Sequence, residues 1–526
     1  MFKKTCLIIV FSLYSIGVLF SQGTDINRHI TKFGQLLFYI DNYYLDSVSS
    51  DTLTEEAIKR VVSLLDPHSS YISAKDVRAM NEPLEGNFEG VGIEFMIIHD
   101  TLVVSTTISG GPSERVGLRS GDRIVEIDGS NIASIGLTNQ MVFGYLRGPK
   151  DSRVNLRVIR RGVNGFLDFE VIRDRIPINS VEAAYEAAPG VVYIKLSRFA
   201  NNSSREIINA LLNLNIRKID GFILDLRGNS GGFLGTALEI SNFFLESGQT
   251  IVYTEGTKVP TRKEIAKGTG FYRSGALAIL IDENSASASE IVAGAVQDWD
   301  RGVIIGRRSF GKGLVQQMLP MADGSQLRLT VARYHTPSGR VIQSPYQTGS
   351  KEQYYRDFLD RFERGESINR DSIHFMESLL YKTMIKGRDV YGGGGIMPDI
   401  FIPADTSFYS NYYATLLRRG VILEYTNNFS DKYREALLPK FPDFIQFNQG
   451  YHISDSFMED FISFATSKGI EFNEQEYLKS KEEILVYFKA LIARSLYGNT
   501  AYFRVINSSN DRVFQAALDY IKNGSR

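Results

Sequence analysis

The chain has 526 residues, of which 43% are hydrophobic and 23% are charged, and this composition excludes disordered, collagen-like and low-complexity proteins. Its length predicts roughly three or four domains of about 150 residues each. The 59 Lys and Arg residues balance 60 Asp and Glu residues, for a net charge of −1. No overall positive field is therefore available to hold nucleic acid or an anionic membrane.

The N-terminal segment has the pattern of a secretory signal. Two lysines precede an apolar run from Cys6 to Phe20, which ends in Ser21-Gln22-Gly23. This pattern predicts a signal peptide over residues 1–22 and an extracytoplasmic, periplasmic mature chain. The run is short for a bilayer span, and an uncleaved anchor is the alternative, with membrane contact through this segment alone. Cys6 is the only cysteine, so disulfide frameworks, cysteine-ligated zinc and a thiol nucleophile are excluded once it is removed.

Residues 24–82 are predicted to form a small helical domain. Apolar residues from Ile26 to Ile40 recur every three or four positions, which is typical of an amphipathic helix. A second helix should end before Pro67, because proline cannot donate the helical hydrogen bond. Its predicted core face comprises Ala57, Ile58, Val61, Leu64 and Leu65.

The pattern then changes to short alternating strands with glycine turns, which predicts a compact sheet domain over 86–175. From 176 to 403, apolar runs alternate with helical stretches, which indicates buried strands in an α/β layered core. Within it, the charged and aromatic segment 345–389 is interpreted as a connector. The last part, 404–526, is predicted to be helical, and we assign its aromatic stripes to a core. These stripes are Phe457, Phe461 and Phe464, then Ile484, Phe488 and Leu491, then Val513, Phe514, Ala517 and Ile521.

A run of small residues joins a predicted strand to a predicted helix and contains Ser285, Ser287 and Ser289. A serine at such a turn lies at the electropositive N-terminus of the helix, beside free backbone amides. This position suits an acyl-transfer nucleophile. Helix capping is the alternative role, and residue type alone does not distinguish the three serines.

Lys312 lies between two glycines after the next predicted strand. A desolvated lysine loses its proton more readily and can accept the proton of a serine, so a serine–lysine pair needs no histidine. None of the six histidines is near the serine cluster in the sequence. Lys312 is therefore the candidate base.

Seven motifs follow one another along the chain: Asp66-Pro67-His68-Ser69-Ser70-Tyr71, Gly90-Val91-Gly92-Ile93, Asp225-Leu226-Arg227-Gly228-Asn229-Ser230-Gly231-Gly232, Ser285-Ala286-Ser287-Ala288-Ser289-Glu290, Phe310-Gly311-Lys312-Gly313-Leu314-Val315-Gln316, Tyr334-His335-Thr336-Pro337-Ser338-Gly339-Arg340 and Gly394-Gly395-Ile396-Met397-Pro398-Asp399. Together they resemble those of the carboxyl-terminal processing proteases, the tail-specific serine peptidases that use a Ser/Lys dyad, and the resemblance spans about residues 30 to 403. It implies an α+β multidomain fold, with a ClpP/crotonase-like α/β layered protease core, an inserted PDZ-like sheet domain and helical N- and C-terminal regions.

The resemblance implies a role for each matching position. Ser287 becomes the nucleophile, Lys312 the general base and Gln316 the residue that orients the lysine amine. One oxyanion amide comes from Gly231 or Gly232 and the other from Ala288. Supporting ion pairs or hydrogen bonds are expected at Arg227, Glu290 and Asp298.

The same resemblance implies that Gly90, Val91, Gly92 and Ile93 present backbone amides to a terminal carboxylate. The strand from Ile93 to Ile97 would then accept an extended peptide as an added strand. The stretch from Gly110 to Ile124 resembles the helix and turn that wall the groove. A PDZ fold that only packs internally is the alternative.

We therefore expect a secreted or periplasmic serine endopeptidase that recognises protein C-terminal tails. Its partners would be proteins with exposed tails, with an adaptor protein as a further candidate, and no nucleic acid, metal or organic cofactor is implied. The main alternative is a noncatalytic PDZ peptide-binding scaffold or chaperone with a decayed protease core. A weaker alternative is an acyl-CoA-type enzyme on the same α/β layer, for which the sequence has no visible adenine or pantetheine site.

Overall fold

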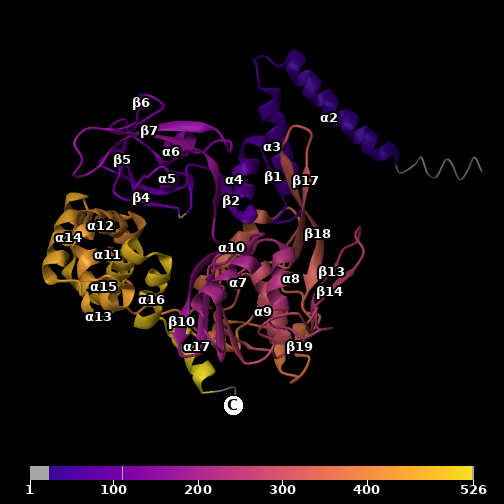
Figure 1. The fold of residues 1–526 in the computed structure, drawn as a ribbon. Helices are drawn as coiled ribbons and strands as arrows, with labels where there is room; N and C mark the ends of the chain where they lie inside the picture. The colour runs from indigo at the N-terminus through magenta and orange to yellow at the C-terminus, as the bar shows by residue number, and fades with distance from the viewer. Residues whose placement is uncertain (1–22, 109, 524–526) are drawn as a thin grey trace, which may run out of the picture.

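The computed structural model describes residues 23–108 and 110–523, so the predicted signal peptide lies outside the described residues. Figure 1 shows the PDZ-like sheet and a group of C-terminal helices on one side and the α/β core on the other. Within the described ranges, none of the helices combines the length and the apolar character that a membrane span requires.

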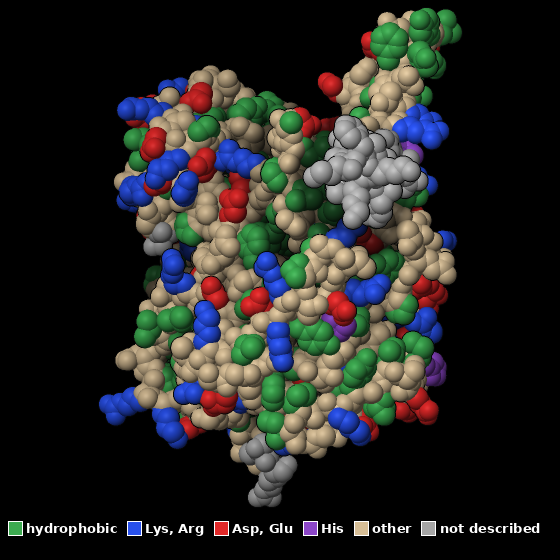
Figure 2. All heavy atoms as spheres, turned by 90° about the vertical axis from the view of Figure 1, so that its right-hand side faces the viewer, with side chains coloured by type: hydrophobic (Ala, Val, Ile, Leu, Met, Phe, Trp, Pro, Cys, Tyr) green, Lys and Arg blue, Asp and Glu red, His purple; other side chains and the backbone are tan. Residues whose placement is uncertain are grey.

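The N-terminal region contains three helices and one strand. They are α2 (Gly23–Tyr43), α3 (Ser50–Ser63), β1 (Ser70–Ile72) and α4 (Ala74–Glu85). Helix α2 projects away from the body (Figure 1), and its apolar side chains, among them Ile26 and Ile30, are exposed. Hydrophobic side chains accordingly gather on the projection at the top of Figure 2.

The structure corrects the predicted core face of the second helix in part. Ala57 and Ile58 are half-buried, whereas Val61, Leu64 and Leu65 are exposed. The fully buried residue of α3 is Val62, and the helix contacts β1.

The PDZ-like unit is a sheet with strand order β3-β4-β5-β7-β8, and β6 pairs with β5. Its elements are β3 (Ile93–Ile98), β4 (Thr101–Thr107), α5 (Pro112–Arg115), β5 (Arg123–Ile127), β6 (Ser130–Asn131), α6 (Asn139–Leu146), β7 (Arg153–Ile159) and β8 (Leu167–Ile172). Leu102, Ile124 and Val154 are fully buried in its core. The chain enters and leaves this unit through an antiparallel ribbon of β2 (Asn87–Gly90) and β9 (Asp174–Pro177).

The α/β core is built on a six-stranded sheet with order β10-β11-β12-β15-β16-β21, parallel except at the β10 edge. The strands are β10 (Val181–Ala188), β11 (Val191–Leu196), β12 (Gly221–Asp225), β15 (Ala276–Ile281), β16 (Val303–Gly306) and β21 (Ile400–Phe401). Phe222 and Leu224 of β12 pack on the face covered by α8 (Leu234–Asn242) and α9 (Ala288–Asp298), next to α7 (Ser203–Leu214). Ile223 faces the other side, which the last helix, α17 (Arg512–Lys522), covers. Burial on both faces explains the continuous apolar runs in the sequence.

A second sheet carries the lysine loop beside this core, with order β1-β18-β13-β14 and β17 paired to β18. Its further strands are β13 (Thr250–Glu255), β14 (Arg262–Ile265), β17 (Leu314–Pro320) and β18 (Gln326–His335). The segment predicted as a connector forms α10 (Lys351–Glu363), two short 3-10 turns, β19 (Leu380–Lys382) and β20 (Asp389–Tyr391). This segment packs against the α/β core and does more than link two parts of the chain. Tyr354 and Arg361 are buried, and Arg361 Nη1 donates a hydrogen bond to the Ser309 carbonyl at 3.0 Å.

The remaining C-terminal helices form a separate core, in which Phe461 and Phe488 are fully buried as predicted. They are α11 (Asn411–Arg418), α12 (Val421–Lys440), α13 (Phe444–Gly450), α14 (Asp455–Ser467), α15 (Glu474–Tyr497) and α16 (Asn499–Ser509). The predicted helical part 404–526 thus contributes to two cores, since α17 packs on the central sheet.

Candidate active site

Ser287 lies between β15 and α9 in a strained backbone conformation. Its φ of 55° and ψ of −110° are unusual for a residue with a side chain, and such strain persists only where the surroundings hold it. The Ser287 N–H donates to the Glu290 carboxylate at 2.8 Å. Gly231 lies so close that a Cβ there would be 2.8 Å from the Ser287 Cβ. The turn at Ser287 is therefore held by Glu290 on one side and by Gly231 on the other.

The structure distinguishes the three serines that the sequence left equivalent. Ser285 and Ser289 are fully buried, and their hydroxyls donate to the carbonyls of Leu226 and Asn229, each at 2.8 Å. Ser287 lines a cavity of about 940 Å³, and the other two do not. Of the three, Ser287 is therefore the one that a ligand in this cavity can reach.

Lys312 lines the same cavity, and its amine is held by a chain of hydrogen bonds. Lys312 Nζ donates to Gln316 Oε1 at 3.0 Å, and Gln316 Nε2 donates to the His68 carbonyl at 2.5 Å. Burial, assisted by the positive charge of Arg328, lowers the pKa of Lys312 to about 8. The amine therefore loses its proton more easily than an exposed lysine.

The Glu290 carboxylate ties the serine turn to the lysine loop. It is fully buried and accepts hydrogen bonds from Ser309 Oγ and from the N–H groups of Ser287, Gly311 and Lys312, at 2.6 to 2.9 Å. Burial raises the pKa of Glu290. One side chain thus holds the backbone on both sides of the cavity.

Tyr334 adds a second link, because its hydroxyl lies 3.2 Å from the Ser287 carbonyl and 2.5 Å from the Lys312 carbonyl. Among the hydrogen bonds of the described residues, none joins Ser287 Oγ to Lys312 Nζ. Catalytic hydrogen bonds in unliganded enzymes are often long and shorten when substrate binds.

The two glycines after β12 differ in their free backbone donors. The Gly231 N–H donates to Asn229 Oδ1 at 2.9 Å. The N–H groups of Gly232 and Ala288 have no acceptor among the described residues. A Cβ on Gly232 would lie 2.2 Å from the Phe199 carbonyl oxygen, so only glycine fits there. The free donors beside Ser287 are therefore those of Gly232 and Ala288.

The residues expected to support the site form buried ion pairs. Arg227 contacts Asp225 at 2.6 Å and Asp511, which precedes α17, at 2.8 Å. Asp298 pairs with Arg340 of the Thr336–Arg340 turn. Across the described part of the chain, no group of three or more His, Cys, Asp or Glu side chains is arranged to hold a metal ion.

Two residues that carry no expected role in the sequence lie at the site in the structure. His68 holds Gln316 through its carbonyl, and Asn229 engages the Gly231 amide. Both belong to motifs that carried the family resemblance. Asp66 explains the local order around His68, because it accepts from Ser69 Oγ at 2.5 Å and from Thr330 Oγ1 at 3.0 Å.

The PDZ-like sheet presents an edge for peptide binding. Strand β3 is an edge strand of its sheet and pairs only with β4 among the described strands. The N–H groups of Val91 and Gly92, just before β3, have no acceptor among the described residues. The predicted groove wall needs correction: α6 flanks β3, since the rings of Phe143 and Phe95 are 5.5 Å apart. Helix α5 instead packs behind the turn, where Ser113 N donates to the Val91 carbonyl.

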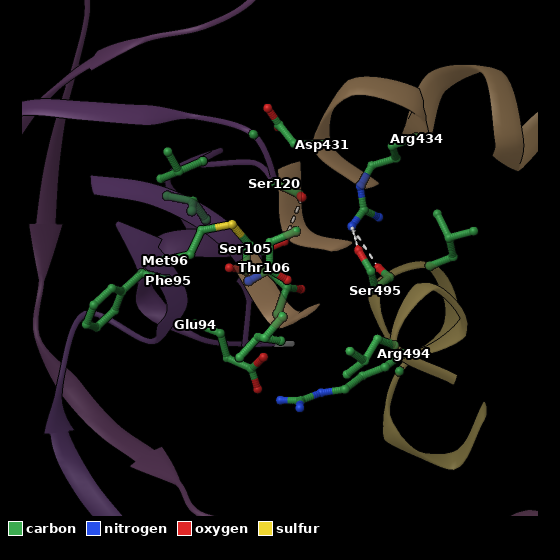
Figure 3. A pocket seen from close by; sticks show the side chains of 18 of the residues that line it. Glu94, Phe95, Met96, Ser105, Thr106, Ser120, Asp431, Arg434, Arg494 and Ser495 are labelled. Atoms are coloured by element: carbon green, nitrogen blue, oxygen red, sulfur yellow. Dashed lines mark hydrogen bonds between the residues drawn. The ribbon is translucent and has the colours of Figure 1, made fainter. Parts of the chain in front are cut away.

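A second cavity, of about 570 Å³, lies between the outer face of the PDZ-like sheet and helices α12 and α15. An ion pair of 3.1 Å joins Arg123 of β5 to Asp431 of α12 beside it. Figure 3 shows Arg434 bonded to Ser495 on the helical side, and Arg494 extending toward Glu94 of β3.

Comparison with known proteins decides the family. The model of peptidase family S41 matches residues 190–349. A carboxy-terminal-processing protease of Bartonella bacilliformis is 35% identical over 60% of this chain and 73% of its own length. The chain belongs to peptidase family S41. This S41 peptidase is 32% identical to the carboxy-terminal processing protease CtpB of Bacillus subtilis, over 58% of this chain and 63% of that protein.

Two further models match parts of the S41 peptidase: a PDZ domain over residues 103–160 and a family of unknown function (DUF8443) over residues 412–498. The solved photosystem II D1 C-terminal processing protease is 25% identical, over 71% of this chain and 87% of that chain, with a TM-score of 0.36. The predicted serine-type peptidase with a PDZ domain and a multidomain α+β fold is confirmed, and family membership favours it over a decayed scaffold.

Proposed function

We propose that this S41 peptidase cleaves peptide bonds with Ser287 as nucleophile and Lys312 as general base. Ser287 Oγ would attack the scissile carbonyl while the neutral Lys312 amine takes its proton. The amine then returns that proton to the leaving peptide amine, and water releases the acyl-enzyme by the same route. One observation carries this proposal: the half-buried Lys312 lines the same cavity as Ser287, and Ser287 is the one serine of its cluster that lines it.

The developing oxyanion would lie between the free N–H groups of Gly232 and Ala288. Preorganised donors of this kind are among the largest contributions to acyl-transfer catalysis. Gly231 would not donate to the oxyanion. Its lack of a side chain would instead allow the glycine turn to lie close to Ser287. Gln316 would hold the amine in position through its contact with His68.

A pKa of about 8 for Lys312 suits a general base near neutral pH. About a tenth of such amines are neutral at pH 7, against fewer than about one in a thousand for an ordinary lysine. Burial of the amine therefore raises the population of the active form by more than a hundredfold.

The protein substrates would dock through their C-terminal tails. The tail would add a strand to the open edge of β3, and the terminal carboxylate would bind the free N–H groups of Val91 and Gly92. Strands β2 and β9 connect the PDZ-like sheet to the core. Docking of the tail would therefore bring the preceding part of the substrate to the cavity beside Ser287. We further propose that the N-terminal segment exports the protein to the periplasm, where an adaptor could present substrates.

Substitution of each dyad residue tests this proposal. In Ser287→Ala and Lys312→Ala, cleavage of a protein with an exposed tail should fall by at least about a thousandfold, with an unchanged unfolding transition. Ser230→Ala is the matched control, since Ser230 also lines the cavity, and it should keep most of the activity. Substantial cleavage by either dyad variant would contradict the proposal.

A further inference from the structure

The cavity beside Ser287 has an unbalanced charge. Arg198, Arg328 and Lys312 line it, and none of the described residues that line it is Asp or Glu. Its other walls are mainly apolar, with Met80, Pro83 and Leu234 among them. A cavity with cationic groups, apolar walls and no acidic group suits an anion.

Arg328 stands on β18 opposite Met318 of β17 and Ser70 of β1. Its Nε is buried and has no hydrogen-bond partner, and the guanidinium forms no ion pair within the described chain. Burial lowers the pKa of Arg328, and no neighbouring carboxylate offsets this effect. The guanidinium therefore lies half-desolvated beside the catalytic lysine without a counter-charge.

Arg198 lies on another wall of the cavity, just after β11 and next to Phe199, which bridges to Gly232. Its Nη1 is also buried without a partner. The guanidinium makes no ion pair with any residue that the structure describes. Two separate segments of the chain thus each bring an unpartnered guanidinium to one cavity.

Other poorly exposed arginines of the described chain have partners for their guanidinium groups. Ion pairs with Asp or Glu hold Arg160, Arg227, Arg308, Arg340 and Arg361, and hydrogen bonds to backbone carbonyls hold Arg173, Arg301 and Arg434. Burying a polar or charged group without a partner is costly, so an unpartnered group calls for an explanation, and a bound ligand that supplies the partner is one.

We propose that the cavity binds a carboxylate of the substrate chain through Arg328 and Arg198, which makes an acidic group near the scissile bond a specificity determinant. The inference rests on the proposed function of Ser287 and deepens it. A guanidinium is suited to this ligand because its fork of N–H donors matches a carboxylate. The carboxylate has two sources: an Asp or Glu side chain, or the C-terminal carboxylate of a short tail.

Matched peptides separate these sources. One series has both ends blocked and carries Glu or the isosteric Gln at each position near the cleaved bond. A second series is neutral and ends in a free carboxylate or an amide. We expect kcat/KM of the wild type to favour the carboxylate member of at least one pair by about tenfold or more. No preference in either series would overturn the proposal.

Substitutions of the two arginines test whether they cause the preference for a carboxylate. In Arg328→Gln or Arg198→Gln the ratio of kcat/KM between the two members of a pair should collapse toward one. Because the ratio is measured within one variant, a general loss of activity cancels. Arg273→Gln, at an exposed ion pair with Glu246, is the control and should keep the wild-type ratio. A preference that survives in both cavity variants would overturn the proposal.

A binding measurement separates failure of this inference from failure of the proposed mechanism. The Ser287→Ala protein is titrated with fluorophore-labelled members of both peptide series, so that no turnover is needed. Tighter binding of the carboxylate member of a pair, lost in Ser287→Ala/Arg328→Gln, supports the carboxylate site even if the dyad proves wrong. Equal binding within the pairs of both series, together with normal cleavage by the wild type, would contradict the carboxylate site and leave the dyad standing.

Discussion

The cavity beside Ser287 and the cavity between the PDZ-like sheet and the C-terminal helices are built in opposite ways. Around Ser287 and Lys312, buried hydrogen bonds fix the backbone, and four of them end on Glu290. Between the PDZ-like sheet and the C-terminal helices, one ion pair joins Arg123 to Asp431, with side chains 35% and 26% exposed. Solvent-exposed ion pairs contribute little to stability. The proposed catalytic site is therefore tightly fixed, whereas the contact between the PDZ-like sheet and the C-terminal helices contributes little to stability.

Removal of the buried Glu290 carboxylate should have the largest effect on both stability and cleavage. Glu290→Ala leaves several buried donors without an acceptor, so we expect the free energy of unfolding to fall by about 3 kcal/mol or more and cleavage to be lost. Denaturant unfolding and a peptide-cleavage assay measure both. Glu246→Ala, at an exposed ion pair, is the control, and an equally small effect of Glu290→Ala would show that the site is not held as described.

Changes at Gln316 should act on catalysis more than on folding. In Gln316→Ala the Lys312 amine loses its acceptor, and we expect kcat/KM to fall by about tenfold to a hundredfold. Gln316→Glu should instead place a carboxylate beside the amine and raise the pKa of Lys312, which moves the pH profile to higher pH. An unchanged pH profile in Gln316→Glu would contradict the contact between the two side chains.

The pH dependence of the wild type reports the same amine. Burial disfavours the charged form and lowers the pKa of Lys312 to about 8. The amine is a base only when neutral, so kcat/KM should rise with pH through about 8 and level off above it. Burial, with the nearby Lys312 charge, lowers the pKa of His68 to about 4, so His68 stays neutral over this range. A rise centred near pH 4 would contradict the assignment of Lys312.

The smallest effect on stability is expected for the ion pair between the PDZ-like sheet and the C-terminal helices. Arg123→Ala or Asp431→Ala should change the free energy of unfolding by less than about 1 kcal/mol. Amide hydrogen exchange in β5 and α12 should become faster, while cleavage of a short peptide without a tail stays at the wild-type rate. Destabilisation by several kcal/mol would show that the two regions form one rigid body.

Local patterns in the sequence predicted the strands of the central sheet and the helices of the C-terminal core, because period and burial are properties of neighbouring residues. They could not predict that α17 covers one face of the sheet, or that the His68 carbonyl holds Gln316, because both contacts join segments far apart in the chain. The choice among Ser285, Ser287 and Ser289, and between Gly231 and Gly232, needed the direction of each hydroxyl and N–H. The exposed face of α2 shows that helical periodicity alone does not establish burial.

The most direct test of the central claim is covalent labelling with a serine-reactive phosphonate, followed by mass spectrometry of the labelled peptide. We expect a single adduct on Ser287, formed rapidly in the wild type and at least about a hundredfold more slowly in Lys312→Ala. An adduct on Ser285 or Ser289, or equally rapid labelling of Ser287 without the lysine, would contradict it.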